Sequence, residues 1–334
     1  MTTKIAINGF GRVGRAALKI ALEKEELEVV AINDLTNTKT LAHLLTHDTI
    51  YGRYTKTTTY DATSLTVDGK QILVTAEKEP AKLPWAELGV DVVLECTGFF
   101  TTAEKAKLHL DAGAKRVIIS APADGEGVDT IILGVNEDEL TDQKIIANGS
   151  CTTNCITPIA KIIEENFGIE KAMMSTVHAM TSIQNLVDGP NKDLRRARAA
   201  SYNIVPTITG AAKATAQAMP SLLGKFDGLS MRVPVPTVSL ADYVILVKRD
   251  TTKEEINRVL KEAAASEAYE SIVAVTEEPA VSSDFIGDPH SSIVDLGLTN
   301  VVAGNLIKVV AWYDNEWGYT NRLVEQAVQL GSKI

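Results

Sequence analysis

The chain has 334 residues, a length at which about two domains are expected. Hydrophobic residues make up 45% and charged residues 23%, which fits a globular protein and excludes disordered and collagen-like classes. Lys and Arg number 33 against 43 Asp and Glu, and a net charge of −10 argues against nucleic acid as the primary partner. The sequence predicts no membrane span, secretory leader or disulfide framework, so we expect a cytoplasmic protein with no membrane partner.

The first half of the sequence alternates strand-like and helix-like segments. Residues 4–8 form a short apolar run, and a glycine turn connects it to a segment with apolar residues at helical spacing. Later segments keep this alternation, with a helical 102–112 among strand-like runs at 28–33, 90–94, 116–120 and 130–134. The pattern predicts an α/β fold in which helices cover a parallel sheet.

The pattern changes from about residue 150. A helical 152–167 leads to a strand-like 171–178 and then to an irregular, basic stretch over 181–202. Helices at 211–219 and 253–266 are outnumbered by strand candidates at 228–233, 237–248, 271–275, 291–295 and 305–313. We therefore predict a first domain over 1–150 and a second, α+β domain with a mostly antiparallel sheet over 151–318. A last helix, 319–331, is expected to pack back onto the first domain.

The glycine turn matches the pattern G-x-G-x-x-G at Gly9, Gly11 and Gly14. The first glycine permits a tight turn, the second lets the backbone approach a pyrophosphate, and the third lets helix and strand pack closely. The helix start that follows offers free N–H groups to phosphates. Asp34 comes 20 residues after Gly14, where a carboxylate holds the adenine-side ribose hydroxyls and repels the extra phosphate of NADP. Glycines also serve plain turns, but this context predicts a Rossmann-type domain that binds NAD.

Cys151 directly precedes an apolar helical run. The dipole of a helix stabilises a thiolate at its amino terminus, so Cys151 is the candidate nucleophile, although many cysteines are simply buried and inert. Cys155, one turn later on the apolar side, fits that inert role, and Cys96 is expected in the core of a strand. The Cys-x3-Cys spacing has no second pair or nearby histidine, so no metal site is predicted.

His178 ends a strand-like run 27 residues after Cys151, which leaves room for a helix out and a strand back. It is therefore the candidate base, although a histidine at a strand end is often only a hydrogen-bonding group. Basic residues cluster in the irregular stretch, at Lys192, Arg195, Arg196 and Arg198, and Arg232 sits at the end of a strand-like run. Such clusters are most often solvated or in subunit contacts, but arginine also suits bidentate phosphate binding. Thr209 and Gly210 precede a helix and predict a further anion-binding helix start.

Six motifs together resemble the phosphorylating glyceraldehyde-3-phosphate dehydrogenase family of the bacterial type, along essentially the whole chain. They lie at residues 8–14, 150–155, 193–199, 209–214, 232–236 and 312–319. The resemblance implies a glycolytic oxidoreductase that converts glyceraldehyde 3-phosphate, inorganic phosphate and NAD to 1,3-bisphosphoglycerate through a cysteine thiohemiacetal and a thioester. It also implies a homotetramer in which the stretch 181–202 is an interface loop.

The resemblance assigns roles residue by residue. Cys151 would attack the aldehyde, and His178 would take the proton as hydride leaves for NAD. The substrate's own phosphate would be held by Thr181, Arg196 and Arg232, and the inorganic phosphate by Ser150, Thr152, Thr209 and Gly210. NAD would contact Gly9, Phe10, Gly11, Arg12, Val13, Asp34, Lys78, Thr97, Gly98, Ser120, Asn315 and Tyr319, with Asn315 on the nicotinamide carboxamide.

Three positions depart from the family's usual pattern. Met180 replaces the usual tyrosine, Gly149 replaces alanine, and Lys78 stands where arginine is common. Erythrose-4-phosphate dehydrogenase, a relative with the same cysteine–histidine pair, is the alternative, because a longer sugar phosphate would use the same arginines. A cysteine hydrolase leaves the glycine turn unexplained, and the net charge disfavours a surface adhesin or an RNA-binding protein.

Overall fold

The computed structural model describes residues 2–334, which divide into two compact units. Unit 1 consists of the described residues up to Ile131, Asp138–Gly149 and Thr320–Ile334. Unit 2 consists of Ile132–Glu137 and Ser150–Tyr319. The last helix, α8 (Trp317–Gly331), therefore begins in unit 2 and continues in unit 1.

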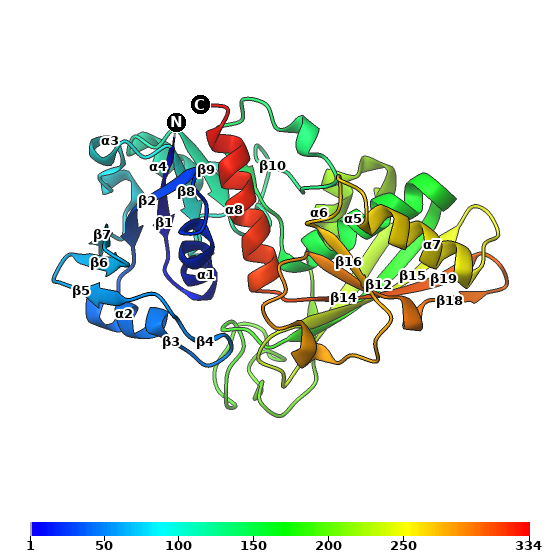
Figure 1. Ribbon diagram of the computed structural model, residues 1–334. Helices are drawn as coiled ribbons and strands as arrows, with labels where there is room; N and C mark the ends of the chain where they lie inside the picture. Colours follow the sequence, from blue (N-terminus) through cyan, green and yellow to red (C-terminus); the bar gives the residue numbers. More distant parts are fainter. Residues whose placement is uncertain (1) are drawn as a thin grey trace. The chain divides into compact units, whose positions relative to one another are not determined.

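Unit 1 is built on a nine-stranded sheet in the order β10-β11-β9-β8-β1-β2-β7-β6-β5 (Figure 1). Neighbouring strands from β10 to β7 are parallel, and only β6 and β5 run antiparallel to their neighbours. The strands are β1 (Thr3–Asn8), β2 (Leu27–Asn33), β5 (Thr58–Tyr60), β6 (Ser64–Val67), β7 (Lys70–Thr75), β8 (Val92–Glu95), β9 (Arg116–Ile119), β10 (Asp129–Thr130) and β11 (Ile145–Ala147). The helices within this unit are α1 (Arg12–Ala21), α2 (Thr38–Thr46), α3 (Trp85–Leu88) and α4 (Ala103–Asp111), and β3 (His47–Asp48) pairs separately with β4 (Gly52–Arg53). The predicted α/β class is confirmed.

The glycine turn between β1 and α1 is set by close backbone contacts. Gly9 has φ +93°, a region that side chains disfavour, and a Cβ on it would lie 2.8 Å from the Thr97 amide nitrogen. A Cβ on Gly14 would lie only 2.1 Å from the Gly9 carbonyl oxygen. Gly11 has no heavy atom within 4 Å of its Cβ position, so the first turn of α1 opens onto free space. Gly9 and Gly14 thus meet two different steric demands of the turn, whereas the position of Gly11 is open.

Unit 2 is built on an eight-stranded sheet in the order β13-β14-β12-β15-β19-β17-β16, with β18 also paired to β19. It is mostly antiparallel, as predicted, and only the pairs β12–β14 and β16–β17 are parallel. The strands are β12 (Ile169–Ala179), β13 (Val205–Ile208), β14 (Phe226–Val233), β15 (Ser239–Val247), β16 (Val273–Thr276), β17 (Ser292–Asp295), β18 (Asn300–Val302) and β19 (Leu306–Tyr313). The helices α5 (Cys151–Phe167), α6 (Ala211–Ala218) and α7 (Lys253–Ala264) complete the unit.

Helix α5 provides the centre of the core of unit 2. Its apolar side, including Cys155, Ile159 and Ile163, packs with inward side chains of β15 and β19 such as Tyr243 and Val309. Burial of this stripe is the main force that holds the helix, since Pro158 inside it removes one helical hydrogen bond.

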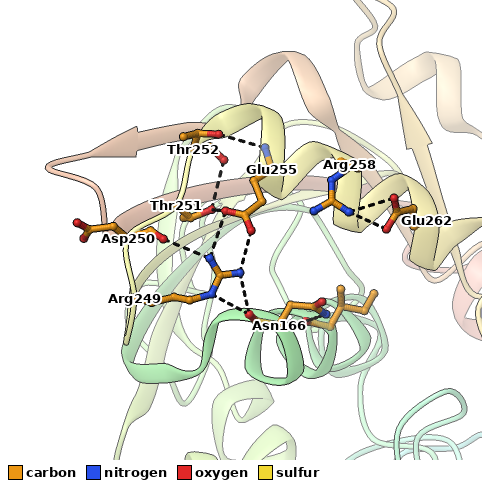
Figure 2. Close-up of polar contacts among 9 residues, drawn as sticks. Asn166, Arg249, Asp250, Thr251, Thr252, Glu255, Arg258 and Glu262 are labelled. Atoms are coloured by element: carbon orange, nitrogen blue, oxygen red, sulfur yellow. Dashed lines mark hydrogen bonds and ion pairs between the residues drawn. The ribbon is translucent and has the colours of Figure 1, made fainter.

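Arg249 fastens the carboxyl end of α5 (Figure 2). Its guanidinium donates to the carbonyl of Asn166 at 3.0 and 3.1 Å and to the carboxylate of Glu255 at 2.9 Å. It also lies over the ring of Phe167, 4.5 Å from its centroid. These contacts satisfy a carbonyl in the last turn of α5, where no helical donor remains, and connect it to the first turn of α7.

The structure differs from the sequence prediction in several places, among them the short strands β11 and β18, for which no strand was predicted. The strand predicted over 130–134 is only the two residues of β10, because Gly134 turns the chain with φ +77°. The edge strand β13 escaped prediction because Pro206 interrupts a short apolar run, and edge strands tolerate proline. The segment 35–89, for which no element was predicted, contains α2, α3 and β3 to β7.

Gly14→Ala is expected to destabilise the protein by about 3 kcal/mol, because its methyl group overlaps the Gly9 carbonyl oxygen. Gly11→Ala is the matched control, since its methyl group meets open space. Urea unfolding followed by circular dichroism would measure both variants. Equal unfolding midpoints for the two variants would contradict this account of the turn.

Candidate active site

Cys151 is the first residue of α5, and the local sequence explains why the helix begins there. Ser150 is the N-cap, and its hydroxyl accepts from the backbone N–H of Thr153 at 3.0 Å. Thr153 completes a capping box by accepting from the Ser150 backbone N–H at 3.2 Å. The Cys151 thiol therefore stands at the positive end of a 17-residue helix, as predicted.

The Cys151 thiol faces the imidazole ring of His178. Its Sγ lies 3.4 Å from Nε2 of His178, which is on β12 and 3% exposed. Nδ1 of His178 lies 2.7 Å from the carbonyl oxygen of Ala179. Nδ1 also lies 2.8 Å from Nη1 of Arg232, which only donates, so the Nδ1 contacts fit either neutral tautomer; in the tautomer protonated at Nδ1, the Nε2 lone pair faces the thiol. This is the orientation that a general base requires.

Arg232 sets the electrostatics of the pair. The parallel register of β12 and β14 places Arg232 opposite His178, and its Nη1 donates to the Ala179 carbonyl at 3.1 Å. Burial, together with the Arg232 charge, lowers the pKa of His178 to about 3. Burial also raises the pKa of the Cys151 thiol, although the Arg232 charge opposes that rise. Burial therefore favours the neutral form of both groups.

Unsatisfied polar atoms gather around Arg232. Its Nε and the hydroxyl of Thr181 are buried without a partner, and so is the Nε2 of Gln184. Burial lowers the pKa of Arg232, and the nearby positive charge of Arg196 lowers it further. The Arg196 guanidinium donates to the Thr207 hydroxyl from Nε at 2.9 Å and from Nη2 at 2.7 Å. Arg196 also pairs with Asp193 at 3.5 Å, so the buried Arg232 is the cation that has no carboxylate partner among residues 2–334, and buried donors beside it are an arrangement that an anion would complete. Gln184 was not among the predicted site residues.

The other predicted phosphate ligands lie at two helix starts. The Thr152 hydroxyl, on α5, is 2.9 Å from the hydroxyl of Tyr313, and the backbone N–H of Thr152 lies in the first turn of the helix, where no helical acceptor is available. Gly210 is the N-cap of α6, and Thr209 accepts from the N–H of Ala211 at 3.2 Å. Helix α6 packs on α5, where the Thr215 and Thr157 hydroxyls are 3.0 Å apart. By contrast Lys192, Arg195 and Arg198 are exposed.

Asn315 presents a donor group of fixed orientation. The Ser239 hydroxyl accepts from the Ala179 N–H at 3.0 Å, and so its own proton goes to the Asn315 Oδ1 at 2.9 Å. The amide oxygen of Asn315 is thereby engaged, and its NH2 group is left to bind a carbonyl oxygen of a ligand. Tyr319, also predicted to contact the cofactor, is buried at the start of α8.

A separate pocket of about 390 Å³ lies within unit 1, beside the glycine turn. Five predicted cofactor residues line it: Gly9, Gly11, Asp34, Lys78 and Thr97. The Asp34 carboxylate accepts from the Phe10 N–H at 2.8 Å and the Thr36 N–H at 2.9 Å, which fixes it at the end of β2. The shape and the open position at Gly11 suit a dinucleotide phosphate and ribose.

The remaining predicted cofactor residues are not on the lining of this pocket. Phe10 is buried and Arg12 pairs with Asp48 at 2.6 Å, whereas Val13 and Ser120 are half-buried and Gly98 is exposed. The lining instead adds residues that the sequence analysis missed: Asn8, Asn33, Leu35, Glu77, Pro80, Cys96, Phe99 and Phe100. Cys96 is half-buried there, so its prediction as a core residue was wrong, because β8 ends one residue earlier. Phe99, the residue after Gly98, could have indicated this part of the pocket, since its side chain is 75% exposed.

Comparison with known proteins identifies the family. Residues 3–103 match the model for the glyceraldehyde 3-phosphate dehydrogenase NAD binding domain, and residues 150–315 match the model for the C-terminal domain. The chain is 52% identical to glyceraldehyde-3-phosphate dehydrogenase 2 of Streptomyces avermitilis, with both chains fully covered. It belongs to the glyceraldehyde-3-phosphate dehydrogenase family.

Other members of the family are similar over the same span. The enzyme of Geobacillus stearothermophilus and enzyme 1 of Bacillus subtilis are each 50% identical, covering all of this chain and 99% of theirs. The match to the NAD binding domain confirms the predicted cofactor, NAD. Within residues 2–334 there is no cluster of metal-ligating side chains and no helix of the length and apolarity that a membrane span needs.

The buried neutral His178 makes stability depend on pH. Because its pKa is about 3 in the folded chain and 6.5 in the unfolded chain, the unfolded state binds more protons between these values. Stability should therefore fall as the pH drops below 6.5, by about 2 kcal/mol at pH 5. His178→Asn should remove this part of the loss, as measured by urea unfolding at pH 7 and pH 5.

The matched control is His43→Asn, at an exposed histidine of α2. This variant should lose as much stability on acidification as the wild type. If His178→Asn also matched the wild type, His178 would not be held neutral by burial.

Proposed function

We propose that this chain is an NAD-dependent phosphorylating glyceraldehyde-3-phosphate dehydrogenase, with residues 1–150 as its NAD-binding domain and 151–318 as its catalytic domain. The observation that carries the proposal is the Cys151–His178 pair beside buried, unsatisfied cationic and polar groups. A neutral aldehyde needs only a thiol and a base, whereas these groups select a substrate that carries an anion. The relatives' names favour glyceraldehyde 3-phosphate over erythrose 4-phosphate, and they place this oxidoreductase in glycolysis.

The first chemical steps use the pair directly. His178 Nε2 takes the thiol proton, the Cys151 sulfur attacks the aldehyde carbon, and the alkoxide that forms takes this proton back from His178 to give a thiohemiacetal. His178 then accepts the hydroxyl proton of the thiohemiacetal as its carbon loses hydride, which leaves a thioester on Cys151. NAD supplies the hydride acceptor, and the Asn315 NH2 group would orient the nicotinamide carboxamide.

The substrate's phosphate also activates the base. Arg232 is one of the two causes that depress the pKa of His178 in the unliganded protein. A phosphate dianion bound to Arg196, Arg232 and Thr181 offsets that positive charge, so it raises the pKa of His178 toward the range useful for proton transfer. Binding of the correct substrate thus prepares its own general base.

The last step returns Cys151 to its resting state. Inorganic phosphate attacks the thioester carbon, the sulfur leaves, and the product is an acyl phosphate. The protonated His178 stabilises the oxyanion of this step. The starts of α5 and α6, with the N–H groups near Thr152 and Gly210, would bind the attacking phosphate.

Inorganic phosphate should be a saturable substrate, and arsenate should replace it. Without either, about one NADH per active site should form in a burst as the thioester accumulates. Cys151→Ser should abolish the burst, whereas the matched control Cys155→Ser should retain it, because Cys155 is buried and takes no part. Rapid-mixing absorbance at the NADH band measures each outcome.

The same assay should distinguish the site for the substrate's phosphate from the site for inorganic phosphate. Arg232→Ala should lower kcat/KM for the aldehyde about a hundredfold, because a desolvated, charge-assisted contact typically contributes a few kcal/mol. Thr209→Ala should instead weaken the dependence on inorganic phosphate. Full-rate NADH formation without phosphate, with the free acid as product, would identify a non-phosphorylating dehydrogenase and refute the proposal.

NAD should be preferred over NADP. The Asp34 carboxylate, held by two backbone N–H groups, would accept from the ribose hydroxyls and repel a 2′-phosphate. A preference of about a hundredfold corresponds to about 2.7 kcal/mol. Steady-state kcat/KM values for NAD and NADP measure this preference, and Asp34→Ala should bring the two values closer together. Equal kcat/KM values for the two cofactors in the wild type would contradict the role of Asp34.

We also propose that the enzyme is a cytoplasmic homotetramer. The outer face of the eight-stranded sheet exposes apolar side chains, among them Met173 at 62% and Leu229 at 43%. The irregular stretch 181–202 adds Leu186, Val187, Leu194 and Tyr202, each more than 60% exposed. Apolar surfaces of this extent are typical of subunit interfaces. The free thiols of Cys96, Cys151 and Cys155 fit a reducing compartment.

A further inference from the structure

Glu95 is a buried acid that the mechanism above does not use. It ends β8, and its side chain is 0% exposed. Its Oε1 accepts from the Thr97 backbone N–H at 2.7 Å and from the Thr97 hydroxyl. Its Oε2 accepts from the Asn8 Nδ2 at 2.5 Å and lies 3.1 Å from the His109 Nε2. An ionised carboxylate has acceptor sites for all four donors, which compensates for its burial.

His109 is fixed as one of these donors. Trp85 Nε1 lies 3.1 Å from the His109 Nδ1, and an indole N–H only donates. Nδ1 therefore carries no proton, and the proton of the neutral ring is on Nε2, which donates to Glu95. Neither His109 nor Trp85 lines the nucleotide pocket.

From Glu95 a directional chain of hydrogen bonds crosses the sheet. Because the Asn8 Nδ2 donates to the carboxylate, the Asn8 Oδ1 is the acceptor for the Asn33 Nδ2, at 2.7 Å. The Asn33 Oδ1 in turn accepts from the Thr75 hydroxyl at 2.8 Å and from the Glu77 backbone N–H at 2.9 Å. The chain follows the neighbouring strands β8, β1, β2 and β7 at their carboxyl ends. The orientation of each amide follows from the fact that a carboxylate only accepts.

A second branch leaves Glu95 in the opposite direction. The Thr97 hydroxyl donates its proton to Glu95, so its oxygen is the acceptor for the Phe99 N–H, at 3.1 Å. Asn8, Asn33 and Glu77 line the pocket on one branch, and Thr97 and Phe99 line it on the other. Both rims of the pocket are thus connected to one buried carboxylate.

We propose that Glu95 is a positioning residue for nucleotide binding, which holds both rims of the pocket in the conformation that accepts the adenosine half of NAD. This inference rests on the assignment of that pocket to NAD. An acid with a purely structural role would affect stability alone. A positioning residue also changes the affinity for the nucleotide while chemistry at Cys151 in the other unit proceeds normally.

Glu95→Gln tests the proposal with little change in shape. An amide can accept at only one of its two ends, so its NH2 group confronts either the Asn8 amide and His109 or the Thr97 N–H and hydroxyl. The dissociation constants of NAD and of ADP-ribose, measured by calorimetry, should both rise tenfold or more. The kcat at saturating NAD should stay within about twofold, and iodoacetamide should alkylate Cys151 at the wild-type rate. Glu104→Gln, at an exposed acid in the first turn of α4, is the matched control and should bind NAD normally.

Thr97→Val provides a second variant, which also serves if Glu95→Gln does not fold. It removes one hydroxyl link and leaves three donors on Glu95, so NAD should bind at least threefold more weakly. The double variant should bind hardly more weakly than Glu95→Gln, because both changes act through the same link.

Asp34→Ala distinguishes a failure of the positioning role of Glu95 from a failure of the assignment of the pocket to NAD. If it weakens NAD binding while folded Glu95→Gln and Thr97→Val bind NAD as the wild type does, the pocket assignment stands and the positioning role is refuted. If none of the three changes affects the affinity, the assignment of the pocket itself is refuted. A loss of kcat in Glu95→Gln equal to its loss of affinity would also overturn the positioning role.

Discussion

The 3.4 Å contact between the Cys151 thiol and His178 is the interaction on which the chemistry proposed for unit 2 depends. It requires the start of α5 to meet the end of β12, so both elements are fixed at their other positions: α5 by its buried stripe and by Arg249, and β12 by pairing on both sides with β14 and β15. The burial that aligns the pair also favours the neutral form of both groups. In the proposed mechanism, the negative charge of a bound phosphate near Arg232 then raises the pKa of His178 toward the range useful for proton transfer.

Much of the fold was predictable because its signals are local. The turn through Gly9, Gly11 and Gly14, the N-cap at Ser150 and the apolar periodicity of α5 each lie within a few residues of the element they define. The segment 35–89 resisted prediction because its strands are short and exist through pairing with one another and with β2. Strand β10 has only two residues, which are too few to show an alternating pattern, so its length could not be predicted from the sequence.

The site shows the same division between local and distant causes. Cys151 and His178 were predicted from a helix start and a strand end, and the resemblance supplied Arg232, but only the register of β12 and β14 places Arg232 opposite His178. The polar network of Asn8, Asn33 and Glu95 went unpredicted for that reason. Each of these residues looks like an ordinary strand end, and their connection depends on strand order, which one-dimensional patterns do not contain.

The inert thiol one helical turn from the nucleophile limits how the enzyme withstands oxidants. Cys155 is buried, in contact with the hydroxyl groups of Ser292 and Tyr243, and burial raises its pKa to about 12. A thiol in that state is not ionised at neutral pH, so it does not attack a sulfenic acid formed on Cys151. An oxidised Cys151 would therefore need a thiol or a reductase from the surrounding solution to be reduced again, because the neighbouring cysteine cannot supply one.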